Sequence, residues 1–222
     1  MSVAERPFDL VLFDLDGTLI DSAPQLALAV NRMLADCGFA TAPEATVRTW
    51  VGNGADKLVK RALAHVGADE ALFATARPLF GDHYQACLLD GLEMYAGVAA
   101  TLQRLHTAGY QLAIVTNKPS DYVAPILEAL GISSLFSLWL GGNSLPQKKP
   151  DPAPLLHACH ELAIPVSRTL MVGDSENDVL AARAAAMPVV ALTYGYNYGR
   201  DIADSHPDWV FDHFCGLDSI LP

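Results

Sequence analysis

Residues 10–22 constrain this chain more than any other stretch. They begin with Leu-Val-Leu-Phe, a continuous apolar run typical of a strand buried on both faces of a parallel sheet. The run ends at Asp14, and Asp16 follows two residues later. Because ligands of open α/β sheets bind beyond the carboxyl ends of the strands, we expect both carboxylates at the rim of a crevice. Carboxylates this close repel each other unless a cation or a shared proton stabilises them.

An acidic turn is the alternative for this stretch. Asp and Gly are ordinary turn residues, Gly17 permits a tight change of direction, and the hydroxyl of Thr18 can close it. The rest of the chain is needed to choose between a turn and a site. A motif remains a hypothesis until its structural context agrees.

Alternating strands and helices are predicted in the second half of the chain. Apolar runs with the spacing of buried strands alternate there with segments of helical spacing. The strands are expected at 111–116, 138–140, 169–172 and 189–192, and the helices at 98–108, 122–130, 152–162 and 177–186. This alternation predicts an α/β, Rossmann-like fold, in which a parallel sheet carries helices on both faces. Trp209, Val210 and Phe211 are expected to be packing residues.

Residues 22–91 differ, because they show helical spacing without a clear strand. Ser22 and Thr41 each stand three residues before a Gln or Glu, the pattern of a capping box, and predict two helix starts. A further helix over 71–89 is expected to break near Pro78. The segment is therefore predicted to be an all-helical insertion.

Two domains follow from this division. The first strand is expected to join the later strands in one sheet, although the helical segment separates them in sequence. Residues 1–21 and 92–222 then form an α/β core domain, and residues 22–91 form a helical cap domain folded over the crevice.

Four motifs along the chain resemble the signatures of the haloacid dehalogenase superfamily of phosphohydrolases. They are Asp14-Leu15-Asp16-Gly17-Thr18-Leu19, Thr116 at the end of a predicted strand, Lys149 before Pro150, and Gly173-Asp174-Ser175-Glu176-Asn177-Asp178. Lys148 is adjacent, but the lysine of the family precedes a proline, which favours Lys149. The resemblance spans nearly the whole chain and implies hydrolysis of phosphate esters.

The resemblance also assigns roles to individual residues. Asp14 would be the nucleophile that forms an aspartyl-phosphate, and Asp16 would be the general acid and then the general base. Thr116 and Asn117 would bind the substrate at its phosphoryl oxygens, and Lys149 would offset negative charge there. Asp16 favours phosphate esters, because its proton is needed by an alcohol leaving group.

Mg²⁺ is the cofactor that the resemblance implies. The carboxylates of Asp14 and Asp174 and the backbone carbonyl of Asp16 would bind it, since Mg²⁺ prefers oxygen ligands. Asp178 and Ser175 would lie behind these ligands, with Asp178 orienting either a metal-bound water or the lysine. Ordinary helix capping is the alternative for Asp174 and Ser175.

Residues 50–55 and 193–199 are similar to stretches of bacterial phosphoglycolate phosphatases, a group within this family. The similarity implies 2-phosphoglycolate as the substrate. Gly52, Asn53 and Gly54 open a predicted helix, whose free amides would receive the substrate carboxylate, or they form only a turn between helices. The tyrosines of 193–199 would contact the cap or pack in the core.

Three further residues carry open alternatives. Lys57 would add positive charge near the substrate or remain solvated. His157 and His160 lie three apart on a predicted helix, as metal ligands can, but matching ligands do not stand near them in sequence. Core or surface roles are the simpler interpretation for both histidines.

Other functions remain possible within this fold. The alternatives are a phosphatase of another small phosphometabolite, a sugar-phosphate mutase, and a non-catalytic phosphometabolite-binding protein. Mutase relatives carry a histidine shortly after the first motif, where this chain has Leu26. A binding protein would ordinarily lack a core group, yet Asp14, Asp16, Lys149 and Asp174 are all present.

The net charge of −11 over 222 residues argues against nucleic-acid or membrane binding, so a small phosphorylated metabolite is the expected partner. The four cysteines lack metal-site spacing and predict free thiols in a reducing compartment, with a disulfide as the alternative. The first seven residues lack the features of a signal peptide, and apolar runs are too short to span a bilayer. We expect a cytoplasmic monomer or homodimer.

Overall fold

A parallel sheet is the centre of the protein, whose computed structural model describes residues 6–222. Its six strands are β1 (Leu10–Phe13), β4 (Gln111–Val115), β5 (Leu138–Leu140), β6 (Thr169–Gly173), β7 (Val189–Leu192) and β8 (Trp209–Phe211). They lie in the order β5-β4-β1-β6-β7-β8, and all neighbours run parallel. The predicted Rossmann-like α/β fold is confirmed.

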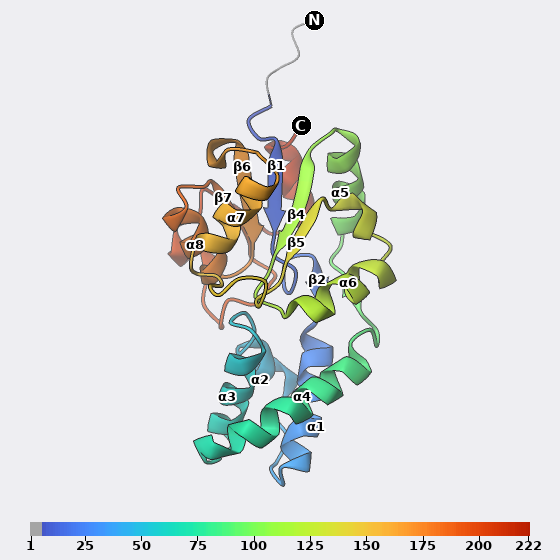
Figure 1. Ribbon diagram of the computed structural model, residues 1–222, viewed down its shortest axis with the longest axis vertical. Coiled ribbons are helices and arrows are strands. Elements are labelled where there is room, and N and C mark those ends of the chain that lie inside the picture. Colours follow the sequence, from blue (N-terminus) through green and yellow to red (C-terminus); the bar gives the residue numbers. More distant parts are fainter. Residues whose placement is uncertain (1–5) are drawn as a thin grey trace, which may run out of the picture.

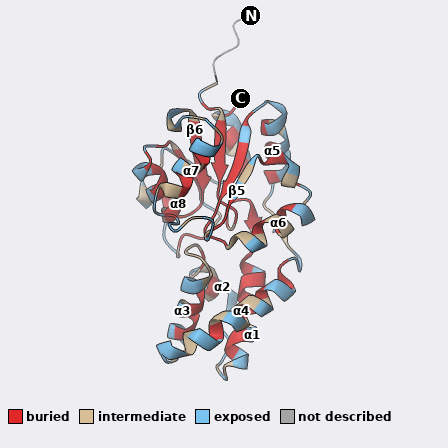
Figure 2. Ribbon diagram, in the orientation of Figure 1, coloured by how far each residue is buried: buried red, intermediate tan, exposed pale blue. Residues whose placement is uncertain are grey.

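Helices cover both faces of this sheet (Figure 1). Their bounds are α5 (Val98–Thr107), α6 (Ser120–Ala129), α7 (Ala153–Glu161) and α8 (Glu176–Ala184). Leu10 and Leu12 of β1 belong to an apolar cluster with α7 and α8, whereas Val11 and Phe13 belong to the cluster that contains α5 and α6. Successive side chains of a strand point to opposite faces, so a continuous apolar run is what a doubly covered strand requires. Figure 2 shows the strands buried and the outer helix surfaces exposed.

Residues 22–91, here called the helical insertion, form a helical layer beyond one end of the sheet (Figure 1). Its helices are α1 (Ala23–Asp36), α2 (Glu44–Arg48), α3 (Ala55–His65) and α4 (Phe73–Cys87). The strands β2 (Ile20–Asp21) and β3 (Glu93–Met94) pair antiparallel where the chain enters and leaves the insertion. The sequence did not predict this pair, because strands of two residues are too short to show a period.

The expected break of the fourth helix near Pro78 was wrong. Helix α4 continues through Pro78, although an internal proline removes a hydrogen bond and ordinarily costs about 3 kcal/mol. Ala76, Phe80 and Tyr84 lie on the buried face of this helix, which packs along α1. Burial of that face offsets the local penalty, so tertiary packing decides the conformation.

Neither expected capping box of the insertion forms. Ser22 does precede α1, but its hydroxyl donates to Asp16 Oδ1 at 2.6 Å instead of accepting from the helix. The side chain of Gln25 likewise turns away and donates to Asp90 O at 2.6 Å. Thr41 lies too far from α2, whose cap residue is Pro43 without a side-chain bond.

The C-terminal part of the chain adds an edge strand. Trp209, Val210 and Phe211, expected only as packing residues, form β8 beside β7. The Trp209 and Phe211 rings pack against the apolar core, as predicted. The prediction was wrong for Val210, which is 39% exposed, because successive side chains of a strand point to opposite faces. Within residues 6–222 the helices are too short or too polar to cross a membrane. Residues 1–5, on which the signal-peptide prediction partly depends, lie outside the described residues.

Candidate active site

Three adjacent strands bring the predicted site together at one edge of the sheet. Strand β1 is hydrogen-bonded to β4 on one side and to β6 on the other, and all three run in the same direction. Asp14, Thr116 and Asp174 directly or closely follow the ends of these strands. Residues far apart in sequence therefore become neighbours, because the carboxyl ends of parallel strands meet at one edge.

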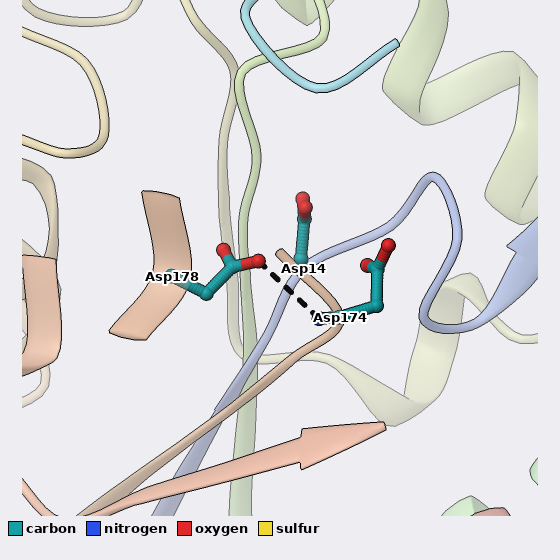
Figure 3. A group of neighbouring side chains, drawn as sticks. All are labelled: Asp14, Asp174 and Asp178. Carbon is teal, nitrogen blue, oxygen red and sulfur yellow. Dashed lines mark hydrogen bonds between the residues drawn. The ribbon is translucent and has the colours of Figure 1, made fainter. Parts of the chain in front are cut away.

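Asp14, Asp174 and Asp178 form an acidic cluster at this edge. One carboxylate oxygen from each lies within 4.8 Å of the others, and all three residues are buried. Figure 3 shows the three side chains close together, with Asp178 coming from α8. Burial raises the pKa of Asp14 to about 6, although Lys149 opposes the rise. Burial and the charge of Asp14 raise the pKa of Asp174 well above its usual value.

Lys149 partly balances this negative charge. Its Nζ lies 3.1 Å from Asp14 Oδ1 and 2.6 Å from Asp178 Oδ1, and its side chain is 1% exposed. Burial lowers the pKa of Lys149, but the two carboxylates raise it by more, so the ammonium stays charged. The neighbouring Lys148 is exposed, which places Lys149 and not Lys148 in the cluster.

Both oxygens of Asp178 are used to hold other groups in place. Oδ1 accepts the bond from Lys149. Oδ2 accepts bonds from Ser175 Oγ at 2.8 Å, from Ser175 N at 3.1 Å and from Asp174 N at 3.3 Å. Asp178 therefore positions the lysine and orders the loop between β6 and α8.

Asp174 is oriented by the first motif and by the loop after β7. It accepts hydrogen bonds from Thr18 Oγ1 at 2.6 Å and from Tyr196 N at 2.6 Å. Gly17 makes this approach possible, because its φ is +87° and a Cβ there would lie 2.3 Å from Asp174 Oδ2. A Cβ at Gly195 would meet the same oxygen at 2.3 Å.

Asp16 is held by two side chains that the sequence did not assign to it. Ser22 Oγ donates to Oδ1 at 2.6 Å, and Lys118 Nζ lies 2.8 and 3.0 Å from the two carboxylate oxygens. Lys118 also donates to the hydroxyl of Tyr84 from α4 at 2.5 Å. A signal for Lys118 existed, since it follows β4 by only a few residues in an acidic chain. Tyr84 lies mid-helix and has no comparable signal.

A pocket lies between this edge and the helical insertion. The sheet side contributes Asp14, Asp16, Thr116, Asn117, Lys118, Pro119 and Tyr122, and the insertion contributes Leu26, Val51, Gly52, Gly54, Ala55, Leu58, Phe80 and Tyr84. Both predicted substrate-binding glycines, Gly52 and Gly54, therefore line the pocket. The side chain of Asn53 is used elsewhere, donating to Asn177 Oδ1 at 3.1 Å and accepting from Arg61 at 2.6 Å.

Asn117 joins the insertion to the lysine loop. Its Nδ2 donates to Gly52 O and to Lys149 O, both at 2.9 Å. The carboxamide nitrogen is thus used in a structural bridge, while its buried Oδ1 has no partner among the described residues. The side chain of Asn117 therefore fixes the distance between two walls of the pocket.

The tyrosine-rich loop 193–199 contacts the insertion. The hydroxyl of Tyr198 accepts a bond from Asn177 Nδ2 at 2.5 Å, and a Cβ at Gly52 would lie 2.7 Å from it. The guanidinium of Arg61 from α3 lies 5.2 Å from the centre of the Tyr198 ring. Of the two alternatives for this loop, contact with the insertion is the one found for Tyr198.

A sequence model described as haloacid dehalogenase-like hydrolase matches residues 11–192. The chain belongs to this family. The matched range includes every residue of the acidic cluster and both lysines that contact Asp14 or Asp16.

Close relatives of this haloacid dehalogenase-like hydrolase share one name. The phosphoglycolate phosphatase of Colwellia psychrerythraea is 50% identical over 211 residues, which is 93% of either chain. The phosphoglycolate phosphatase of Pasteurella multocida is 50% identical over 221 residues, covering 96% of this chain and 98% of the relative. A crystal structure of a predicted phosphoglycolate phosphatase from Haemophilus somnus 129PT has a TM-score of 0.94 at 45% identity, covering 98% of this chain and 99% of the other.

Other residues named from the sequence lie away from the site of this hydrolase. Lys57 is exposed and does not line the pocket. His160 is exposed beside Glu161, and neither His157 nor His160 belongs to a potential metal group within residues 6–222. The four cysteines are free thiols.

Proposed function

We propose that this chain hydrolyses small phosphomonoesters through an aspartyl-phosphate, with 2-phosphoglycolate as its substrate. One observation carries the proposal, namely that Lys149 and Asp174 converge from separate segments on Asp14, which lines the pocket together with Asp16. A carboxylate nucleophile divides a very slow hydrolysis into two easier steps. The family membership of the chain agrees with this chemistry.

Each step has a candidate proton donor or acceptor. In the first step an oxygen of Asp14 attacks phosphorus, the bond between phosphorus and the alcohol oxygen breaks, and Asp16 gives that oxygen a proton. Water then attacks the phosphoryl group, Asp16 takes a proton from it, and phosphate leaves the regenerated carboxylate of Asp14. The phosphoryl oxygens would be held by the Thr116 hydroxyl and the Lys149 ammonium. The Thr116 hydroxyl hydrogen-bonds the carboxylate of Asp14.

The donor set fits Mg²⁺. Asp14 and Asp174 are buried carboxylates whose mutual repulsion a divalent cation would relieve, and Mg²⁺ prefers such oxygen ligands. The backbone carbonyl of Asp16 is the third expected ligand, and Asp178 would stay behind these ligands, where it holds Lys149 and the Ser175 hydroxyl. When bound, the cation would reduce the repulsion between Asp14 and the approaching phosphate dianion.

The substrate assignment rests on the relatives and on the pocket. Relatives about 50% identical over nearly the whole chain are named phosphoglycolate phosphatase. The first turn of α3 lines the pocket through Gly54 and Ala55, and no side chain caps it. Free amides and the positive end of a helix dipole attract a carboxylate. Leu26 occupies the place of the mutase histidine and lines the pocket, which favours transfer to water over transfer to a sugar.

The same proposal includes the domain division and the location of the protein. Residues 1–21 and 92–222 would act as the catalytic core, and residues 22–91 would act as a cap that completes the pocket. The antiparallel pair of β2 and β3 at their junction supports this division. The free thiols support a cytoplasmic location, since such thiols persist in a reducing compartment.

A phosphate-release assay tests the proposal. The purified chain is given 2-phosphoglycolate, ethyl phosphate and several sugar phosphates, each with Mg²⁺ or with a chelator. We expect release of phosphate that needs Mg²⁺ and is fastest with 2-phosphoglycolate. A profile that is flat or favours sugar phosphates would refute the substrate, and release that is equal in chelator would refute the metal. A rearranged sugar phosphate as product would instead select a mutase.

A further inference from the structure

We infer that Lys118, assisted by Tyr84, selects substrates whose leaving group carries a carboxylate. The inference deepens the proposed function and rests on it, because it adds two side chains to the free amides of α3 as groups that recognise the glycolate part of the substrate. Their side-chain hydrogen bonds join Asp16 to Lys118 and Lys118 to Tyr84 and do not involve Asp14, the proposed nucleophile. Their contacts, burial and position in the pocket support the assignment.

Lys118 is the cationic side chain among the described residues that line the pocket. Lys149, the other buried lysine of the site, faces Asp14 and Asp178 instead. The side chain of Lys118 is 2% exposed, and much of the pocket wall around it is apolar, including Leu26, Leu58 and Phe80. A charge pair formed there would be weakly screened by water.

The reach of Lys118 matches the length of a short leaving group. Its Nζ lies 2.8 Å from Asp16 Oδ1, and Asp16 is the proposed donor to the alcohol oxygen. In glycolate the carboxylate carbon is separated from that oxygen by a single methylene group. An ester held with its alcohol oxygen at Asp16 therefore carries its carboxylate into the neighbourhood of the Lys118 ammonium.

Tyr84 offers a second contact from the insertion. An ammonium has three donors, and those of Lys118 serve the two oxygens of Asp16 and the hydroxyl of Tyr84. A substrate carboxylate would replace the Tyr84 oxygen as the third acceptor. The displaced hydroxyl, freed from accepting, would donate its own hydrogen to the same carboxylate. Tyr84 is 2% exposed and T-shaped against Tyr122, so its ring stays positioned during the exchange.

Two substrates that share the same methylene ester linkage isolate this role. Ethyl phosphate has a methyl group where 2-phosphoglycolate has its carboxylate, and both need the same attack and protonation. We expect Lys118→Met to lower the ratio of kcat/KM for 2-phosphoglycolate to that for ethyl phosphate by about 30-fold, the effect of losing a buried charge-assisted bond. Tyr84→Phe should lower the ratio by about 5-fold. Lys57→Met, an exposed lysine of α3, should change it by less than about 2-fold.

Inhibition by glycolate adds a readout that needs no carboxylated substrate. With ethyl phosphate as substrate, glycolate should inhibit the wild type, and its inhibition constant should rise about 30-fold in Lys118→Met. If this variant is inactive on both esters, Tyr84→Phe decides by the same two measurements.

Equal losses on both esters would overturn the inference, because they would show that Lys118 only positions Asp16. A wild-type preference for 2-phosphoglycolate that survives in Lys118→Met would also overturn it while leaving the proposed function standing. The proposed function fails separately, if the wild type does not prefer 2-phosphoglycolate to ethyl phosphate.

Discussion

The two walls of the pocket differ in chemistry and in how the chain builds them. The sheet wall carries Asp14 and Asp16 after β1 and Lys118 after β4, two segments far apart in sequence. The insertion wall carries mainly apolar side chains and glycines, and Tyr84 is the tyrosine that it presents. Under the proposed function, the sheet wall would perform the reaction, and the insertion wall together with Lys118 would limit which leaving groups enter.

Polar links connect the walls, in addition to the packing of Tyr84 against Tyr122. Asn117 bonds the carbonyl of Gly52, and Lys118 bonds Tyr84. Because these links are specific, a change in one wall can alter the other. Substitutions of Asp14 should slow every ester alike, whereas substitutions at the links, Lys118 included, should alter substrate preference.

Asp14→Asn gives the largest expected effect, because it removes the proposed nucleophile from the sheet wall. The amide is a poor nucleophile, so kcat should fall by more than about 1,000-fold on every ester. Steady-state kinetics with 2-phosphoglycolate and ethyl phosphate measure this. Turnover near that of the wild type would contradict the assignment of the nucleophile, and a loss confined to one ester would contradict the division between the walls.

The same substitution should stabilise the metal-free protein at neutral pH. Burial raises the pKa of Asp14 from 3.8 to about 6, so the folded state holds this proton more tightly than the unfolded state. The free energy of unfolding therefore falls as pH rises from about 3 to about 7, by about 3 kcal/mol for this group. Urea unfolding in chelator should show the advantage of Asp14→Asn growing by that amount between about pH 3 and about pH 7. An advantage independent of pH would contradict the prediction.

Lys149→Met should have the next effect and tests the charge balance of the sheet wall. The substitution removes the ion pairs of Lys149 with Asp14 at 3.1 Å and with Asp178 at 2.6 Å. The negative charge of these carboxylates then repels the phosphate dianion. We expect kcat/KM to fall about 100-fold on both esters. Lys148→Met is the matched control, because Lys148 is adjacent and exposed. A larger loss in Lys148→Met would reverse the choice between the two lysines.

Ser22→Ala gives the smallest expected effect. It tests whether the Ser22 hydroxyl, at the boundary of the insertion, serves Asp16 or helix α1. The hydroxyl bonds Asp16 and does not cap α1, so kcat should fall about 5-fold with little change in melting temperature. Thr41→Ala, in the other expected capping box, is exposed and should change neither quantity. A lower melting temperature with unchanged kcat would restore the capping role of Ser22.

Much of the sheet wall was predictable because its signals are local. An apolar run followed at once by a polar residue marks Asp14, Thr116 and Asp174, and parallel topology then brings such residues together. The helical content of the insertion was predictable, but the continuity of α4 through Pro78 was not. Pro78 carries a strong local signal for a break, and packing of α4 on α1 overrides it.

By itself the sequence determined the α/β sheet, the helical nature of residues 22–91 and the acidic residues at the strand ends. These features depend on the order of apolar and polar residues within short windows. Only the tertiary structure decided that Ser22 turns to Asp16 and that Lys118 joins Asp16 to Tyr84. Such partners lie up to 102 positions apart, and their choice depends on how the insertion folds back over the sheet.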